Sequence, residues 1–427
     1  MMLIFYNIVQ LLALLILGPF LALWLLTSAK YRDRLPRRLG FGLSRMVRGL
    51  RPGPRVWVHA LSVGEVASAR PLLLAIRQEM PEMVVILSTT TRGGKEYAKR
   101  LAGLVDCLVP FPLDLYWVVA RFIKLLRPDL FILVETDFWP NLLARLGRQG
   151  VPSLLVNGRI TRRSMARYQR FKFLFAPLFN GFKMISMQMA EDATRLAELG
   201  LDPRKIVACG NLKYDLVDSL TRPGPVLDLG TCGLTGRPLL VAGSTHKGEE
   251  AVLLQAFAAL RATYPGLAMV IAPRSLERAA EVMSLAVEAG LTCGLRSTSA
   301  GNKPCQVLVL DTLGELALLY RQAELAFVGG SLVKEGGHNP LEPAFFGKPV
   351  LFGPDMSDFA EISRDLLRVG AAETVTAESL LGIIGSLLSQ KERRARMGQA
   401  AADLVQSHQG AAHRHLELIR EAVSHGR

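Results

Sequence analysis

The chain has 427 residues, enough for two or three domains that each have their own core. Its 51 Lys and Arg against 37 Asp and Glu give a formal net charge of +14, which predicts an anionic partner. The sequence has no zinc-finger, RNA-recognition or basic-zipper signature, so we expect that partner not to be nucleic acid. The five cysteines lack metal-ligand spacing, and we expect them to be reduced.

Residues 1–29 contain no charged side chain and consist mostly of Leu, Ile, Phe and Val. Because about 20 apolar residues span a bilayer as a helix, this stretch predicts a single transmembrane anchor. A cleaved signal peptide is the alternative, but it would need a basic start and a small-residue cleavage site. A basic cluster follows the stretch: Lys30, Arg32, Arg34, Arg37 and Arg38. By the positive-inside rule, it predicts an inner-membrane protein whose body lies on the cytoplasmic side, with anionic lipids as partners.

The rest of the chain alternates short, β-branched apolar runs with helical stretches. The first set of runs covers residues 56–60, 83–90, 130–137, 153–159, 184–188 and 206–211. The second set covers residues 239–245, 268–274, 307–311, 325–330 and 349–353. Near-continuous apolarity is typical of strands buried on both faces, and helices between such strands imply parallel sheets.

A Pro- and Gly-rich stretch without helical periodicity, residues 221–238, separates the two sets and predicts an interdomain linker. The predicted domains are therefore residues 30–220 and residues 239–427, the second including the C-terminal helices. We expect an α/β fold with two doubly wound, Rossmann-like domains that face each other across a cleft. In such domains, ligands bind beyond the carboxyl ends of the strands.

Three of these strand ends lead into the same pattern, in which Ser, Thr or Asn precedes Glu by three residues. The segments are 62–65, 312–315 and 339–342. The spacing is that of a helix capping box, so each glutamate could be a local cap. However, Gly64 and Gly314 precede two of the glutamates, and a cap does not need glycine there. A helix N-terminus also binds anions, so the pattern equally fits a ligand site.

The stretch 327–354 contains six glycines, and two pairs of them lead into the third of these segments. A long loop that ends in a helix cap is one interpretation. The other is a loop that binds a phosphorylated ligand, with Gly336 and Gly337 allowing close approach of the backbone.

Further polar residues follow strands of both sets. They are Glu135, Asp137, Arg159, Lys213, Thr245, His246, Lys247 and Arg274. Ion pairs or solvated charges could explain individual members. Their concentration at strand ends favours ligand binding at both predicted sheets.

Eight ordered segments together resemble the 3-deoxy-D-manno-octulosonic acid (Kdo) transferases of lipid A assembly. The segments are residues 57–66, 135–143, 157–161, 210–215, 242–250, 272–274, 311–316 and 327–343. They follow the family's order and extend over nearly the whole body of the chain.

The resemblance implies a GT-B glycosyltransferase that moves Kdo from CMP-Kdo to a lipid A precursor with inversion at the anomeric carbon. It implies Glu65 as the general base, with Glu135 and Lys213 supporting the transition state. The implied nucleotide contacts are Pro273, Arg274, Leu313, Gly314, Glu315, Asn339, Pro340, Leu341 and Glu342. The chain has Asp137 where the family often has Glu, which leaves the role of Asp137 open.

No Asp-x-Asp pair and no His-rich motif is present in the sequence, so we expect no cofactor and a metal-independent reaction. Cationic side chains and helix N-termini would then stabilise the leaving phosphate. Two alternatives come from other classes: a GT-B-type sugar-nucleotide epimerase, and a non-catalytic, membrane-tethered nucleotide-binding scaffold. The sequence does not specify the number of Kdo units added, the preferred precursor or the oligomeric state.

Overall fold

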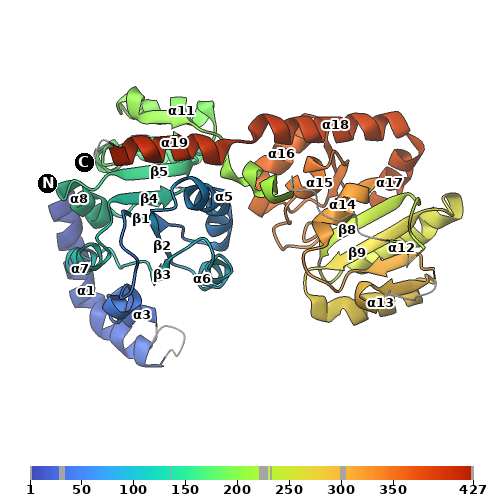
Figure 1. Ribbon diagram of the computed structural model, residues 1–427, viewed down its shortest axis with the longest axis horizontal. Helices are drawn as coiled ribbons and strands as arrows, with labels where there is room; N and C mark the ends of the chain where they lie inside the picture. The colour runs from blue at the N-terminus through green and yellow to red at the C-terminus, as the bar shows by residue number, and fades with distance from the viewer. Residues whose placement is uncertain are drawn as a thin grey trace. The chain divides into compact units, whose positions relative to one another are not determined.

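The computed structural model of the protein describes residues 2–27, 34–135, 137–220, 229–230, 233–298 and 304–424. The chain forms two compact units, one of Met1–Leu216 with Gln409–Arg427 and the other of Val217–His408. Each unit contains a parallel sheet with helices packed on its faces (Figure 1). The prediction of two doubly wound α/β units is therefore confirmed.

The first sheet has the strand order β3-β2-β1-β4-β5-β6-β7, and every pairing in it is parallel. Its strands are β1 (Arg55–His59), β2 (Val84–Thr89), β3 (Cys107–Pro110), β4 (Leu130–Val134), β5 (Ser153–Gly158), β6 (Met184–Met187) and β7 (Ile206–Ala208). The helices of this unit are α1 (Met2–Thr27), α3 (Arg34–Arg38), α4 (Leu43–Met46), α5 (Val63–Glu79), α6 (Arg92–Lys99), α7 (Tyr116–Leu126), α8 (Pro140–Arg148), α9 (Arg162–Arg170), α10 (Lys172–Asn180), α11 (Ala190–Ala197) and α19 (Ala411–Ser424).

Both faces of this sheet are covered, and β1 shows the reason for its continuous apolarity. Trp57 points into a core that includes residues of α7, α8 and α10. Its neighbours Val56 and Val58 point into a second core that includes residues of α5 and α19. Successive side chains of a strand face opposite sides, so a strand covered on both sides must be apolar throughout.

The second sheet has the strand order β10-β11-β9-β8-β12-β13-β14 and is also parallel. Its strands are β8 (Leu239–Thr245), β9 (Ala268–Pro273), β10 (Cys293–Leu295), β11 (Val307–Val309), β12 (Leu325–Val328), β13 (Val350–Phe352) and β14 (Ala372–Thr374). Its helices are α12 (Glu249–Thr263), α13 (Ala279–Glu288), α14 (Leu316–Gln322), α15 (Leu341–Phe345), α16 (Ala360–Arg368), α17 (Leu380–Ser389) and α18 (Lys391–His408). Leu240 and Val241 on β8 again enter different cores.

The C-terminal helix departs from the predicted domain boundaries, which placed residues 239–427 in the second domain. Residues Gln409–Arg427 instead belong to the first unit, where α19 packs against α5. Asp215 accepts hydrogen bonds from the backbone N–H groups of Gly410 (2.8 Å) and Ala412 (2.6 Å) at the start of α19. The sequence shows an amphipathic helix here but not which sheet it covers. The predicted linker, 221–238, lies largely outside the described residues.

The N-terminal helix α1 also differs from the prediction. Within the described ranges, no helix has both the length and the apolarity needed to cross a membrane, so a transmembrane anchor over residues 1–29 is not supported. Polar side chains join α1 to the first unit: Tyr6 donates to Asp114 Oδ2 (3.1 Å), and the amides of Asn7 and Asn141 exchange two hydrogen bonds (2.8 and 2.9 Å). Of the predicted basic cluster, Lys30 and Arg32 lie outside the described residues.

Candidate active site

In the first unit, the predicted catalytic residues lie at the carboxyl edge of the sheet. Glu65 is in the first turn of α5, after β1, and Glu135 directly follows the neighbouring strand β4. Lys213 follows β7. This edge is the ligand-binding edge of a doubly wound sheet.

Glu65 has the contacts of a helix cap. Ser62 is the N-cap residue of α5 and accepts a hydrogen bond from the Glu65 N–H (3.4 Å). In return, the Glu65 carboxylate accepts hydrogen bonds from the Leu61 N–H (2.5 Å) and the Ser62 hydroxyl (3.2 Å). The capping interpretation of the segment 62–65 is therefore correct, and it fixes the carboxylate at the end of the strand.

The electrostatic surroundings of Glu65 differ from those of an ordinary cap. Burial raises the pKa of its carboxyl group to about 7, although the hydrogen bond from Leu61 opposes the shift. The negative charges of Glu135 and Asp137 contribute to this increase, so the three carboxyl groups lie close enough to interact. A carboxylate with a pKa near 7 is suited to general base catalysis at neutral pH.

The backbone at this edge is strained. Glu135, which follows β4, has a φ angle of 65°. Asn157, near the end of the neighbouring strand β5, has a φ angle of 57°. Non-glycine residues rarely adopt such angles, and the strained positions tend to cluster at functional sites.

Several buried polar atoms at the same edge have no hydrogen-bond partner among the described residues. They are Thr90 Oγ1, Asp137 Oδ2, Trp139 Nε1 and Asn157 Nδ2. Burial also raises the pKa of Asp137. Because buried polar groups are nearly always paired, these atoms mark this edge as a candidate ligand site. Trp139 and Thr90 were not among the predicted site residues. Trp139 lies in the segment 135–143 that carries the family resemblance, and the position of Thr90 after β2 is the signal that could have suggested it.

Lys213 is positioned by a network of amide side chains. Asn211 accepts a hydrogen bond from the Lys213 N–H (3.0 Å) and donates to Gln188 (3.0 Å). Asn157 accepts from the Leu212 N–H (2.9 Å). The loop that carries Lys213 is thus held to the ends of β5 and β6. Gln188 and Asn211 were not predicted as supports of Lys213, because no spacing rule connects the three residues.

In the second unit, the predicted nucleotide contacts follow β9, β11 and β12. Pro273 ends β9, and the Arg274 N–H donates to Thr245 O (2.9 Å) on the adjacent strand. After β11, the side chain of Leu313 is 83% exposed and Gly314 has a φ of +86°. This exposed segment is available to a ligand.

The segment 312–315 is not the capping box that its spacing suggests. Glu315 is itself the N-cap residue of α14 and makes no side-chain bond to the helix backbone. Instead it pairs with Arg296 (3.1 Å) and accepts a hydrogen bond from the Thr312 hydroxyl. Burial raises the pKa of Glu315, but the bonds from Arg296 and Thr312 outweigh it, so the pKa is lowered overall.

The segment 339–342 is not a capping box either, because the N-cap residue of α15 is Pro340, which makes no side-chain cap bond. The Asn339 side chain accepts from the Leu341 N–H (3.1 Å), two residues on, and donates to Glu342 (3.4 Å). Burial raises the pKa of Glu342, and the bond from Asn339 opposes this.

The glycine-rich loop after β12 packs against the protein itself. A Cβ atom on Gly336 would lie 2.9 Å from Asp358 Cγ, and one on Gly337 would lie 2.4 Å from Met356 Sδ. Both glycines also have positive φ angles. Close packing against residues 355–358 therefore accounts for this glycine pair without the close approach of a ligand that one of the two interpretations expects.

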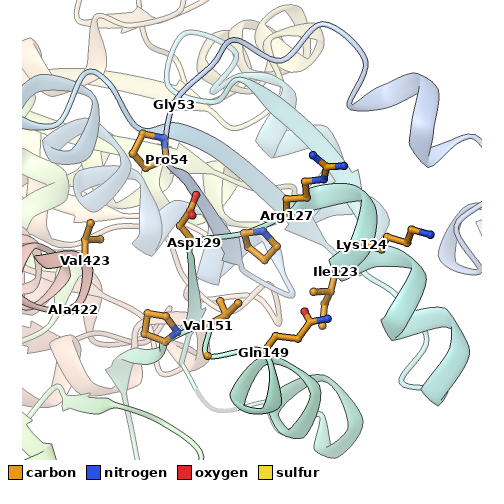
Figure 2. Close-up of a pocket in the computed structure, with 13 residues that line it drawn as sticks. Gly53, Pro54, Ile123, Lys124, Arg127, Asp129, Gln149, Val151, Ala422 and Val423 are labelled. Atoms are coloured by element: carbon orange, nitrogen blue, oxygen red, sulfur yellow. The ribbon is translucent and has the colours of Figure 1, made fainter. Parts of the chain in front are cut away.

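A cavity of about 780 Å³ lies at the opposite end of the first sheet (Figure 2). It is lined by segments that precede β1, β4 and β5, including Pro54, Asp129 and Val151, and by Val423 of α19. None of the predicted site residues lines it. Within the described part of the chain, no group of three or more His, Cys, Asp or Glu side chains is arranged to hold a metal ion.

Comparison with known proteins identifies close relatives. Residues 33–216 match the family described as 3-deoxy-D-manno-octulosonic-acid transferase (kdotransferase). The 3-deoxy-D-manno-octulosonic acid transferase of Haemophilus influenzae is 36% identical, covering 97% of both chains. The enzyme of the same name from Bordetella pertussis is 32% identical, covering 95% of this chain and 96% of its own.

Solved structures with a similar fold include UDP-GlcNAc 2-epimerase from Neisseria meningitidis, with a TM-score of 0.55 at 11% identity. Another is MurG from Acinetobacter baumannii, with a TM-score of 0.54 at 13% identity. Each match covers 86% of this chain and 99% of the other. At these identities the likeness shows the fold alone, and together with the two parallel-sheet units it supports a GT-B fold.

Proposed function

The chain belongs to the 3-deoxy-D-manno-octulosonic acid (Kdo) transferase family and is a glycosyltransferase, and from this premise we propose that it moves Kdo from CMP-Kdo to a lipid A precursor. The reaction inverts the anomeric carbon. The substrates are proposed from the family and from the chemistry of the candidate site.

Glu65 acts as the general base. It removes the proton of the attacking sugar hydroxyl as the hydroxyl oxygen bonds to the anomeric carbon of Kdo. The bond from that carbon to the phosphate oxygen breaks, and CMP leaves with the electron pair. The observation that carries this proposal is the Glu65 carboxyl group, fixed at a strand end with a pKa of about 7. Such a base contributes about 10²–10⁴-fold to the rate.

Charge that develops on the leaving phosphate is stabilised by cations and helix N-termini, without a metal ion. Lys213 and Arg274 are the proposed cations, and Glu135 supports the transition state. The segments after β9, β11 and β12 bind CMP through the residues that the family resemblance implies. Asn339 and Glu342 bond to the ribose hydroxyls, and the bond between their two side chains holds them in place.

We also propose that the protein works at the cytoplasmic face of the inner membrane by surface contact. Large apolar side chains of α1 are exposed, among them Phe5 (66%), Leu15 (66%) and Phe20 (72%). An exposed apolar helix beside basic residues such as Arg34 and Arg37 favours an anionic lipid surface. In a flotation assay, the protein should rise with vesicles that contain anionic phosphatidylglycerol and rise less with neutral vesicles. Equal behaviour with both would contradict an electrostatic contribution.

The proposed reaction is tested by incubating the purified protein with CMP-Kdo and a tetraacylated lipid A precursor. Mass spectrometry should show products heavier by one or more Kdo units. The epimerase alternative predicts conversion of a UDP-sugar and thermal protection by UDP, whereas our proposal predicts protection by CMP. Stabilisation by UDP alone would therefore exclude the proposed function.

A further inference from the structure

Two histidines of the second unit contact each other at the carboxyl edge of its sheet. His246 directly follows β8, and His338 lies in the glycine-rich loop after the neighbouring strand β12. Their Nε2 atoms are 2.8 Å apart, and their rings are nearly parallel, with centroids 5.1 Å apart. One imidazole therefore donates a hydrogen bond to the other. Both side chains remain partly exposed, so a ligand can reach them.

A single buried carboxylate holds the two segments together. Glu249 is fully buried, and its Oε2 accepts from the backbone N–H groups of His246 (2.8 Å) and Gly330 (2.7 Å). Its Oε1 accepts from those of Ser331 and Leu332, both at 2.9 Å. These four bonds couple the start of α12 to the loop that carries His338. The imidazole pair is thus held in place by the backbone before any ligand binds.

Gly330 leaves the space that the pair needs. A Cβ atom there would lie 3.1 Å from His338 Cδ2 and 3.5 Å from His246 Cδ2. Its φ of +71° also favours glycine. The backbone at Ser244, two residues before His246, has a φ of 56°, which is strained for a non-glycine residue.

The charge around the pair is positive. Burial, together with the positive charge of Arg274, lowers the pKa of His338 to about 4, so Arg274 lies close enough to act on the ring. Arg274 forms no salt bridge with any residue that the structure describes. Hydrogen-bond donors beside an arginine that lacks an acidic partner form a binding site for an anion.

We propose that His246 and His338, together with Arg274, bind an anionic group of the donor, either the carboxylate of the sugar acid or the phosphate of the nucleotide. The two imidazoles supply hydrogen-bond donors and Arg274 supplies charge. Binding replaces the contact between the two rings with bonds to the anion. This inference rests on the proposed function, because the donor is a nucleotide-activated sugar acid.

The test compares His246→Ala and His338→Ala with the wild-type enzyme. The KM for CMP-Kdo should rise roughly tenfold to a hundredfold, as expected for lost hydrogen bonds to a charged group. The KM for the acceptor should not change, and the melting temperature should stay within about 2 °C, because the backbone remains held by Glu249. His413→Ala on the exposed face of α19 is the matched control and should behave as wild type. If an alanine variant does not fold, His338→Gln, which keeps a polar atom near the position of Nε2, replaces it and should give a smaller increase.

Calorimetry with CMP separates the two sources of the anion. Weaker CMP binding in the variants assigns the pair to the phosphate, whereas unchanged CMP binding with a raised KM for CMP-Kdo assigns it to the sugar carboxylate. If both constants stay at wild-type values while the wild type turns over CMP-Kdo, the inference is wrong and the proposed function stands. If the wild-type enzyme neither binds CMP nor uses CMP-Kdo, the proposed function fails and the inference fails with it.

Discussion

Glu65 is both a helix cap and the candidate base, and one substitution separates the two roles. Glu65→Gln keeps the shape of the side chain, and glutamine also fits the third position of a capping box. At pH 4.5, where the Glu65 carboxyl group of the folded protein is protonated and as neutral as the amide, we expect the free energy of unfolding to change by about 1 kcal/mol or less. Turnover should fall at least roughly a hundredfold because an amide cannot accept the proton.

The control is Glu342→Gln, which should weaken CMP binding first because that residue belongs to the proposed nucleotide segment. CMP binding to Glu65→Gln should match the wild type. Near wild-type turnover by Glu65→Gln would limit Glu65 to its capping role and make Glu135 the next candidate base.

The pKa of Glu65 predicts opposite pH dependences for activity and for stability. The base acts only when it is deprotonated, so kcat/KM of the wild type should rise as the pH passes through about 7. In Glu65→Gln, kcat/KM should not show this rise. Its folded-state pKa lies above the ordinary value of 4.5, so the folded state binds this proton more tightly than the unfolded state. The stability contributed by protonated Glu65 is therefore present below pH 4.5 and lost as the pH rises towards 7.

Denaturation of the wild type and of Glu65→Gln between pH 4.5 and pH 8 tests this sign. The variant should gain stability relative to the wild type as the pH rises. A constant difference across that range would show that the pKa of Glu65 is not raised in the folded protein.

Among the elements of the first unit, α19 lies farthest along the chain from the strands that it packs against. Its Leu416 and Ile419 are fully buried in the core shared with β1 and α5. His415 is also buried: its Nδ1–H donates to Ala411 O (2.7 Å), and its Nε2 accepts from Ser186 Oγ (2.9 Å) and the Asn157 N–H (3.2 Å). The helix thus supports the strand ends that carry the candidate site.

Leu416→Ala should therefore destabilise the first unit. Loss of a fully buried leucine side chain costs about 2–5 kcal/mol, measured as the change in free energy of unfolding by urea denaturation. Glu417→Ala, at an exposed position on the same helix, should change it by no more than about 0.5 kcal/mol. Equal effects of the two substitutions would mean that α19 does not contribute to the core of this unit.

For the whole molecule, the proposed reaction needs no metal ion. Activity with CMP-Kdo should persist after dialysis against EDTA, because cationic side chains and helix N-termini stabilise the leaving phosphate. Loss of activity on chelation and its recovery with Mg²⁺ or Mn²⁺ would contradict the proposal. Glu135 and Asp137 would then be the first ligands to substitute.

The sequence by itself determined the two-unit α/β architecture. Runs such as 56–60 and 239–245 are mostly apolar because helices cover both faces of each strand, so the sequence shows this pattern locally. The cap of α5 by Ser62 could be predicted for the same reason, since a capping box depends on residues three positions apart, although the same spacing at 312–315 and 339–342 does not form one.

Only the tertiary structure decided features that depend on residues far apart in the chain. The packing of α19 in the first unit, the contact of α1 with Asp114 and the His246–His338 pair each join distant segments. The raised pKa of Glu65 likewise comes from burial and from the charges of Glu135 and Asp137, which follow the neighbouring strand β4. Hydrophobic periodicity specifies which face of an element is buried, but the choice of partner depends on the shape and hydrogen bonding of the packed surfaces, which no local pattern encodes.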